Sequence, residues 1–197
     1  MALYTPRAFA GTSRAEALAL IDAHPFATLI TSIDGDEPAV THLPLLREND
    51  EALIGHMARA NPHWQRFSQG RTLAVFHGPH AYVSPRWYEA PSSTVPTWNY
   101  ATVHVGGLPE LLDEAAAAAA VRVLTQRFDP QFVPAATVVE TLLRGIVAFR
   151  LPVARLDAKF KMNQNKTAAH RAGVVAGLRA TGAGEDAAVA DWMQTHE

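Results

Sequence analysis

Residues 26–46 read FATLITSIDGDEPAVTHLPLL and decide the fold class. Apolar and β-branched residues fill both ends of this stretch, and Asp34-Gly35 marks a turn between them, which predicts a hairpin of strands 26–33 and 39–46. Pro44 lacks the N–H group that a neighbouring strand would bind. The second strand is therefore expected at a sheet edge or with a bulge, either as protection against aggregation or because a ligand approaches it.

A helix precedes this hairpin. Ser13 and Glu16 have the S-x-x-E spacing of a capping box, apolar residues follow on one helical face, and Pro25 prevents continuation. The pattern predicts a helix over residues 13–24.

The rest of the chain continues as short strands with helices outside them. A short helix is expected from Asn61-Pro62 to Phe67, a longer one over 113–128, and two more within 167–194. Further strands are expected over 52–57, 72–77, 81–84, 97–105 and 146–156, and Pro152 is expected to interrupt the last of them. Because the strands gather in the middle without regular alternation with helices, the sequence predicts an α+β fold, an antiparallel barrel or sandwich with peripheral helices.

Composition limits the function classes. The chain has 197 residues, 48% of them hydrophobic, a net charge of −2 and no cysteine. We expect one domain over residues 1–197, with a helical C-terminal extension from about residue 166. A nearly neutral chain argues against coating a nucleic acid, and the lack of a signal-like start or a long apolar run predicts a soluble cytoplasmic protein without membrane contact. The histidines show no metal-ligand spacing, so no metal site is expected.

Two segments in the first half of the chain could bind a ligand. Residues 55–64, GHMARANPHW, put Arg59 and Asn61 where a strand ends and a helix begins. These side chains and free N–H groups of the first helical turn could bind a phosphate, unless Asn61 only caps its helix and Arg59 only meets solvent. Residues 41–45, THLPL, could turn backbone groups toward a flat heterocycle, or could form a protected edge.

Two later segments carry further candidates. Trp98-Asn99-Tyr100 could wall a pocket for a ring, although such aromatic residues more often fill a core or a subunit interface. Residues 159–166, KFKMNQNK, are either a polar connector or a second set of phosphate or cofactor donors, and Asn165 could cap the next helix.

Four segments together resemble a known family. In order along the chain they are HMARANPHW, AVFHGPHAYVSPRWY, VPTWNYATVHVGG and KFKMNQNK, and they closely resemble the PaiB family of FMN-binding negative transcriptional regulators. The resemblance implies a split β-barrel related to pyridoxamine-phosphate-oxidase-like flavoproteins, usually a homodimer with FMN at the subunit interface. One departure is Met162-Asn163, where the family's element has a Leu-Ser pair, and it leaves position 163 without an expected role.

The resemblance also implies a cofactor site. Residues 41–45 would lie along the isoalloxazine ring, residues 56–61 would reach the phosphate and ribityl chain, and residues 161–166 would close the site, from the same or the partner subunit. The FMN-binding candidates are Thr41, His42, Leu43, Pro44, His56, Met57, Ala58, Arg59, Asn61, Trp98, Asn99, Lys161, Gln164 and Asn165.

Two functions follow from this interpretation. The first is an FMN-binding regulator that represses transcription, with DNA or a regulatory protein as a partner. Residues 172–194 contain one arginine and no lysine, so direct reading of DNA by the C-terminal helices has weak support. The alternative is an FMN-dependent oxidoreductase that passes electrons from a reduced nicotinamide to a small acceptor. The residues alone do not decide whether the protein is an enzyme.

Overall fold

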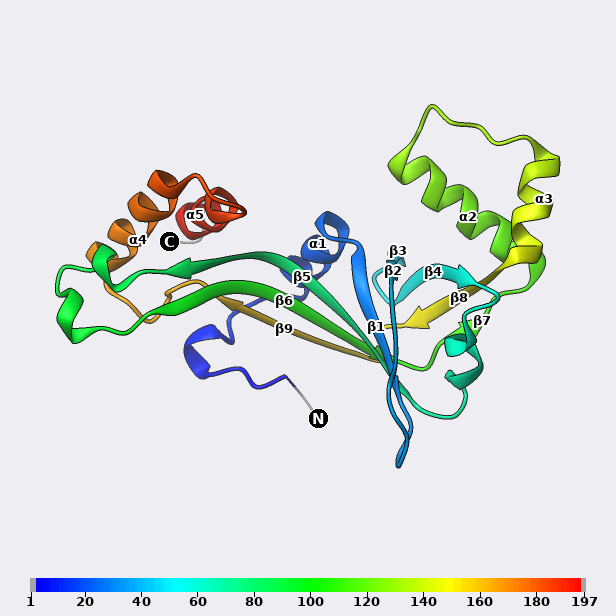
Figure 1. The fold of residues 1–197 in the computed structure, drawn as a ribbon, viewed down its shortest axis with the longest axis horizontal. Helices are drawn as coiled ribbons and strands as arrows, with labels where there is room; N and C mark the ends of the chain where they lie inside the picture. The colour runs from blue at the N-terminus through cyan, green and yellow to red at the C-terminus, as the bar shows by residue number, and fades with distance from the viewer. Residues whose placement is uncertain (1–2, 196–197) are drawn as a thin grey trace. The chain divides into compact units, whose positions relative to one another are not determined.

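The computed structural model describes residues 3–195, and Figure 1 shows the order of the elements along them. The strands are β1 (Phe26–Ser32), β2 (Ala39–Pro44), β3 (Leu46–Asn49), β4 (Ala52–Ala58), β5 (Arg71–Val83), β6 (Thr97–Gly107), β7 (Glu110–Leu111), β8 (Ile146–Pro152) and β9 (Arg155–Lys161). The α-helices are α1 (Arg14–Ala23), α2 (Glu114–Phe128), α3 (Ala136–Gly145), α4 (Ala168–Thr181) and α5 (Asp186–Thr195), and the short 3-10 helices are η1 (Arg7–Phe9), η2 (Pro62–Arg66), η3 (Pro85–Trp87) and η4 (Pro91–Ser93).

The chain divides into two compact units, and strands β5 and β6 contribute residues to both. Unit 1 contains the described residues up to 17, residues 77–103 and the described residues from 157, and unit 2 contains residues 18–76 and 104–156. The expectation of a single domain stays a prediction.

Two sheets organise the strands. One has the order β2-β1-β5-β6-β9 and the other the order β3-β4-β8-β7. The hairpin expected from residues 26–46 is present, since β1 pairs antiparallel with β2 and Phe26 lies opposite Pro44. The predicted bounds of its second strand, 39–46, are wrong, because β2 ends at Pro44 and Leu46 begins β3 in the other sheet. Because β2 is the edge strand of its sheet and Pro44 is its last residue, the missing N–H group costs no sheet hydrogen bond.

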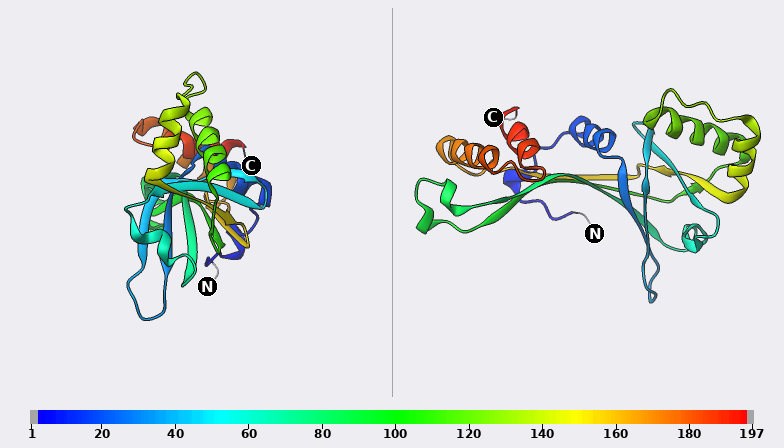
Figure 2. Two further views of the ribbon diagram at one scale, coloured as in Figure 1. Left: turned by 90° about the vertical axis from the view of Figure 1, so that its right-hand side faces the viewer. Right: turned by 45° about the horizontal axis from the view of Figure 1, so that its top comes forward.

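In unit 2, buried residues of β3, β4 and helix α2 form one cluster, which consists of Leu46, Ile54, Ala120 and Leu124. Leu29, Leu45, Leu53 and Phe149 are fully buried. Helix α2 begins at the expected cap, since Asp113 accepts a hydrogen bond from Ala116 N, and it packs against β4 and β8. Figure 2 shows α2 and α3 together in this unit.

Unit 1 carries the C-terminal helices, which form where the sequence predicts them. Thr167, not Asn165, caps α4, and Gly182 ends it in the left-handed conformation. Helices α4 and α5 pack together (Figure 1). Trp87 lies against Gly177, where an added Cβ would come within 2.3 Å of its ring, so only glycine permits this approach.

One predicted break in a strand is wrong. The sequence suggests two strands, 72–77 and 81–84, separated by Gly78-Pro79, but β5 runs without interruption from Arg71 to Val83. Strand β1 pairs with β5 only as far as Val75. Pro79 lies beyond that pairing, so a proline is tolerated there.

Three other expectations need correction in the second half of the chain. Residues 146–156 contain the whole of β8 and the first two residues of β9, and these strands belong to different sheets because the chain changes sheet after Pro152. Residues 159–161 are the end of β9 rather than a connector. Helix α3 was not predicted, because it is rich in β-branched residues and Ala135 provides no side-chain cap.

Candidate functional site

Strands β2 and β4 come close together in unit 2, and Gly55 makes this possible. A Cβ added at Gly55 would lie 2.6 Å from Leu45 Cδ2 and 3.0 Å from the carbonyl oxygen of Pro44. Any side chain at this position would therefore push the two strands apart. Residues 41–45, expected along a flavin ring, and residues 56–61, expected near its phosphate, are neighbours for this reason.

Thr41 and Asn61, two of the predicted site residues, are joined directly. Asn61 Nδ2 donates a hydrogen bond of 3.0 Å to Thr41 Oγ1, while Asn61 Oδ1 accepts one of 3.0 Å from the backbone N–H of His63. The second bond is the helix cap, which sequence analysis left as an alternative to a ligand role. The cap fixes the amide so that its nitrogen faces Thr41.

His63 continues this arrangement into the core. Its Nδ1 lies 2.8 Å from Thr41 Oγ1 and its Nε2 lies 2.8 Å from Thr31 Oγ1, which in turn lies 2.8 Å from Thr72 Oγ1. His63 is only 2% exposed. Burial, and secondarily the positive charge of Arg66, lowers the pKa of His63, so the ring is neutral at pH 7.

Sequence reasoning gave His63 no role. The available signal was its position two residues after Asn61 in the quoted HMARANPHW segment, where the capping bond directs the start of η2. Thr31 and Thr72 gave no signal, because they are distant in sequence and meet His63 only in the folded sheet.

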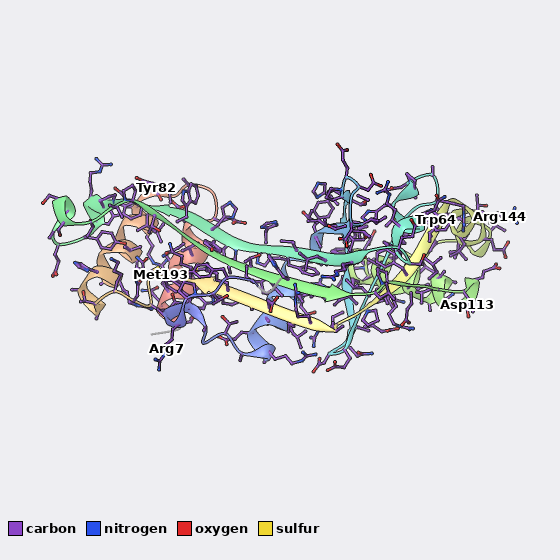
Figure 3. All side chains as sticks on the ribbon, turned by 90° about the horizontal axis from the view of Figure 1, so that it is seen from below. Arg7, Trp64, Tyr82, Asp113, Arg144 and Met193 are labelled. Carbon is purple, nitrogen blue, oxygen red and sulfur yellow. The ribbon has the colours of Figure 1, made fainter. Side chains whose placement is uncertain are left out.

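Arg59 binds backbone carbonyl groups at the junction of α3 and β8. Its Nε donates to Arg144 O at 2.9 Å and its Nη2 donates to Ile146 O at 2.7 Å. Trp64 Nε1 donates to Arg59 O, and Trp64 and Arg144 are labelled near each other in Figure 3. The guanidinium is exposed and pairs with no carboxylate among residues 3–195, so its positive charge stays available to an anion.

The backbone N–H groups suggested for this anion are largely in use. Arg59 N donates to Gly145 O, Asn61 N donates to Ala58 O and His63 N donates to the Asn61 cap. Fewer backbone N–H groups are therefore free at the start of η2 than the sequence predicts, because η2 is a 3-10 helix of five residues with a proline at its first position.

His56 on β4 has an unpartnered polar atom. Its Nδ1 is buried and has no hydrogen-bond partner in the described chain. Burial lowers the pKa of His56, which favours the neutral ring. A buried ring nitrogen without a partner is rare in folded proteins and fits a group that a ligand completes.

The other candidates on β2 and β4 have varied surroundings. His42 is exposed, and its Nδ1 lies 3.1 Å from Thr28 Oγ1. Leu43 and Met57 are each 4% exposed and belong to the core. Ala58 is exposed at the end of β4.

Trp98 and Lys161 form the second group of candidates, in unit 1. The Trp98 ring is 53% exposed and meets the Tyr82 ring edge-on, with ring centroids 6.0 Å apart. Lys161 Nζ donates to Trp98 O and Thr97 Oγ1. Burial, followed by the charges of Lys159 and Lys166, lowers the pKa of Lys161.

The amide candidates of unit 1 serve the local structure. Asn99 is fully buried, and its Nδ2 donates to Met193 Sδ (Figure 3 labels Met193) while its Oδ1 has no partner in the described chain. Gln164 closes the turn after β9, since it accepts from Met162 N and donates to Phe160 O. Asn165 is exposed.

Within unit 2, then, the structure joins Thr41 and Asn61 through hydrogen bonds and brings Gly55, next to His56, against β2. Trp98, Asn99, Lys161, Gln164 and Asn165 belong to unit 1. A role in cofactor binding stays a prediction for each of these residues.

Comparisons with known proteins identify the family. Residues 3–155 match the family described as "Putative FMN-binding domain". The chain is also 31% identical to the Bacillus subtilis protein named protease synthase and sporulation protein PAI 2, over 83% of each chain. The chain belongs to this FMN-binding family. The resemblance to PaiB is confirmed, and FMN is the cofactor of the family.

Solved structures agree on the fold. The FAD and heme binding protein from Mycobacterium smegmatis superimposes with a TM-score of 0.66 at 19% identity, covering 88% of this chain and 80% of that one. The flavocytochrome Anf3 from Azotobacter vinelandii gives a TM-score of 0.60 at 20% identity, covering 77% and 72%. The predicted α+β class, of the antiparallel split-barrel type with peripheral helices, is confirmed.

Proposed function

We propose that this protein binds FMN in unit 2, against β2 and the end of β4, and acts as a flavin-dependent regulator of transcription. The observation that supports the site best is the half-buried Thr41 hydroxyl on β2, which forms hydrogen bonds with Asn61 and His63 at the start of η2. The Thr41 hydroxyl and the Arg59 guanidinium lie on the same unit.

This donor set fits the chemistry of FMN. A phosphate dianion needs positive charge, and Arg59 has no carboxylate partner in the described chain. The polar edge of the ring needs a few directed hydrogen bonds in an apolar slot, and Thr41 can contribute one beside Leu43 and Pro44. When bound, FMN supplies electron-transfer chemistry, while the protein provides binding and orientation.

The visible absorption spectrum of the purified protein, with and without added FMN, tests the cofactor. We expect a bound flavin spectrum and quenching of flavin fluorescence at saturation. Failure of the unaltered protein to bind FMN would refute the proposal.

Substitution of Arg59 tests the phosphate contact. Arg59→Ala is expected to raise the Kd for FMN about tenfold or more, because hydrogen bonds to charged groups contribute roughly 1.5–3 kcal/mol. Arg144→Ala is the matched control, since it removes a neighbouring exposed cation but leaves the backbone carbonyl that Arg59 binds. Equal affinity of both variants would remove Arg59 from the site.

The regulatory part rests on the PaiB relationship and needs a separate test. The protein's own upstream DNA, in an electrophoretic mobility shift assay with and without FMN, provides it. We expect sequence-specific, salt-sensitive binding that changes when FMN is added. A complete lack of such binding would refute direct repression and leave only regulation through a partner.

The second candidate function is an FMN-dependent oxidoreductase. It has support from the likeness to a flavocytochrome, which extends to the fold alone at 20% identity. Anaerobic mixing of the FMN-loaded protein with reduced nicotinamides distinguishes it, because a reductase bleaches the flavin absorbance. Absence of bleaching at every donor concentration would favour the regulator.

We propose further that the protein is a homodimer. The exposed Tyr82 and Trp98 rings are apolar surface that a second copy could cover. Sedimentation velocity tests this directly, and a monomer at micromolar concentration would refute it.

A further inference from the structure

His63 is a buried histidine, and each of its ring nitrogens forms a hydrogen bond with a threonine hydroxyl. The proposed FMN contacts do not by themselves explain these two hydrogen bonds. Its two partners are Thr41 Oγ1 on β2 and Thr31 Oγ1 on β1. The chain of bonds continues inward to Thr72, which is 4% exposed, and outward to Asn61. The ring is neutral, so one nitrogen carries a proton and the other accepts.

The first possible arrangement puts the proton on Nε2. The Thr41 hydroxyl must then donate to Nδ1, and Nε2 donates to Thr31 Oγ1. The two remaining hydroxyl protons, on Thr31 and Thr72, share a single bond between these residues. One of the two therefore has no acceptor in the described network, and both residues are buried. An unpaired donor in the core is costly.

The second arrangement puts the proton on Nδ1. Nδ1 then donates to Thr41 Oγ1, Thr31 donates to Nε2 and Thr72 donates to Thr31, so every buried proton has an acceptor. Thr41 Oγ1 now accepts from both His63 and Asn61. Its own proton is the single one left over, and Thr41 is half-buried on the edge strand instead of in the core.

We infer that His63 carries its proton on Nδ1 and thereby leaves the Thr41 hydroxyl as a hydrogen-bond donor aimed out of the network. The ligand atom that it meets is an acceptor, a carbonyl or phosphate oxygen or an unprotonated ring nitrogen. His63 is a positioning residue in this arrangement, because it acts through Thr41. The inference rests on the proposed function for the identity of the ligand, which is FMN.

The tautomer can be measured in the protein without FMN. In full-length protein labelled with 15N-histidine, a two-bond 1H–15N correlation spectrum at pH 7.5 distinguishes the protonated nitrogen from the accepting one. The His63 signals are those that disappear in His63→Gln. A protonated Nδ1 is expected, and a protonated Nε2 would overturn the inference.

FMN titrations test the donor role of Thr41. Thr41→Val removes the hydroxyl with little change of shape, and we expect the Kd for FMN to rise about tenfold. Thr41→Ser restores the hydroxyl and is expected to return the Kd to within about twofold of the original. Thr72→Val is the matched control, since it removes a hydroxyl from the far end of the same network and is expected to leave the Kd within about twofold.

The outcomes separate the two proposals. Tight FMN binding by a folded Thr41→Val variant would overturn the donor role while leaving FMN binding intact. If the unaltered protein does not bind FMN, the proposed function fails, and the spectrum of the free protein still decides the position of the proton on His63.

Discussion

Gly55→Ala tests the close approach of β2 and β4, on which the whole candidate site depends. The added Cβ would lie 2.6 Å from Leu45 Cδ2, 3.0 Å from Pro44 O and 3.3 Å from Leu43 Cδ1. Leu45 is fully buried and Leu43 is 4% exposed, so neither can move into solvent. Relief of the overlap therefore requires a shift of the strands themselves.

The expected magnitude is the difference of two effects. Overpacking a well-packed core costs about 1–3 kcal/mol. Replacing glycine with alanine restricts the unfolded chain and returns about 0.4–1 kcal/mol. The net loss of stability is about 1–2 kcal/mol, which corresponds to a fall in Tm of roughly 2–8 °C for a chain of this size.

Urea unfolding followed by circular dichroism measures this loss. Gly11→Ala is the matched control, because an added Cβ at Gly11 would meet nothing within 4 Å. Gly11→Ala is expected to leave stability unchanged or slightly raised, and Gly55→Ala to lower it and weaken FMN binding.

A double substitution makes the test specific to the named contact. Leu45→Ala alone creates a cavity and is expected to cost about 2–5 kcal/mol. In the double variant, Leu45→Ala removes the Cδ2 atom that clashes with the new Cβ of Gly55→Ala. The stability loss of the double variant should therefore be about 1 kcal/mol smaller than the sum of the two single losses. Simple addition of the two losses, or a Gly55→Ala protein as stable as the original, would refute the reasoning.

Three further predictions concern stability. Burial lowers the pKa of both His56 and His63, so the unfolded chain takes up more protons than the folded protein below about pH 6.5, the ordinary pKa of histidine. The unfolding free energy measured in urea is therefore expected to fall as the pH is lowered below that value, by at most about 1.4 kcal/mol per pH unit for each histidine until the folded pKa is reached. A flat profile of the unfolding free energy between pH 7.5 and 5.5 would contradict this prediction. Gly177→Ala gains about 1 kcal/mol of helix propensity but puts a Cβ 2.3 Å from the Trp87 ring. We expect the unfolding free energy to fall by about 1 kcal/mol in total and the tryptophan emission to change. A more stable protein would show that the ring can move. Ser13→Ala removes the two hydrogen bonds of the Ser13 hydroxyl in the capping box at α1, although the Ser13 backbone N–H can still donate to Glu16. This change is expected to cost about 1 kcal/mol by thermal unfolding, whereas no change would mean that water replaces the cap.

The local signals in the sequence were sufficient for most elements. The capping box at Ser13 and Glu16, the turn at Asp34-Gly35 and the cap at Asp113 involve residues within a few positions of one another, so their physics is complete in a short segment. Helix α3 lacked such a signal, since its start has no capping side chain and its valines and threonines favour strands when read alone.

Pairing between distant segments was the part that the sequence left open. Pro79 was interpreted as a strand break because nothing local reveals that β1 stops pairing with β5 at Val75. Pro152 marked an interruption, but the exchange of one sheet for the other at that point depends on which strands are available as partners.

The same division applies to the candidate site. The sequence alone determined the family resemblance, FMN as the cofactor and the segments around Thr41 and Arg59, because these depend on residue type and order. Only the tertiary structure decided that Arg59 holds two backbone carbonyls and that His63 links Thr41 to Thr31. Hydrogen-bond partners separated by twenty or more residues are chosen when the strands assemble, and a linear pattern carries no record of that choice.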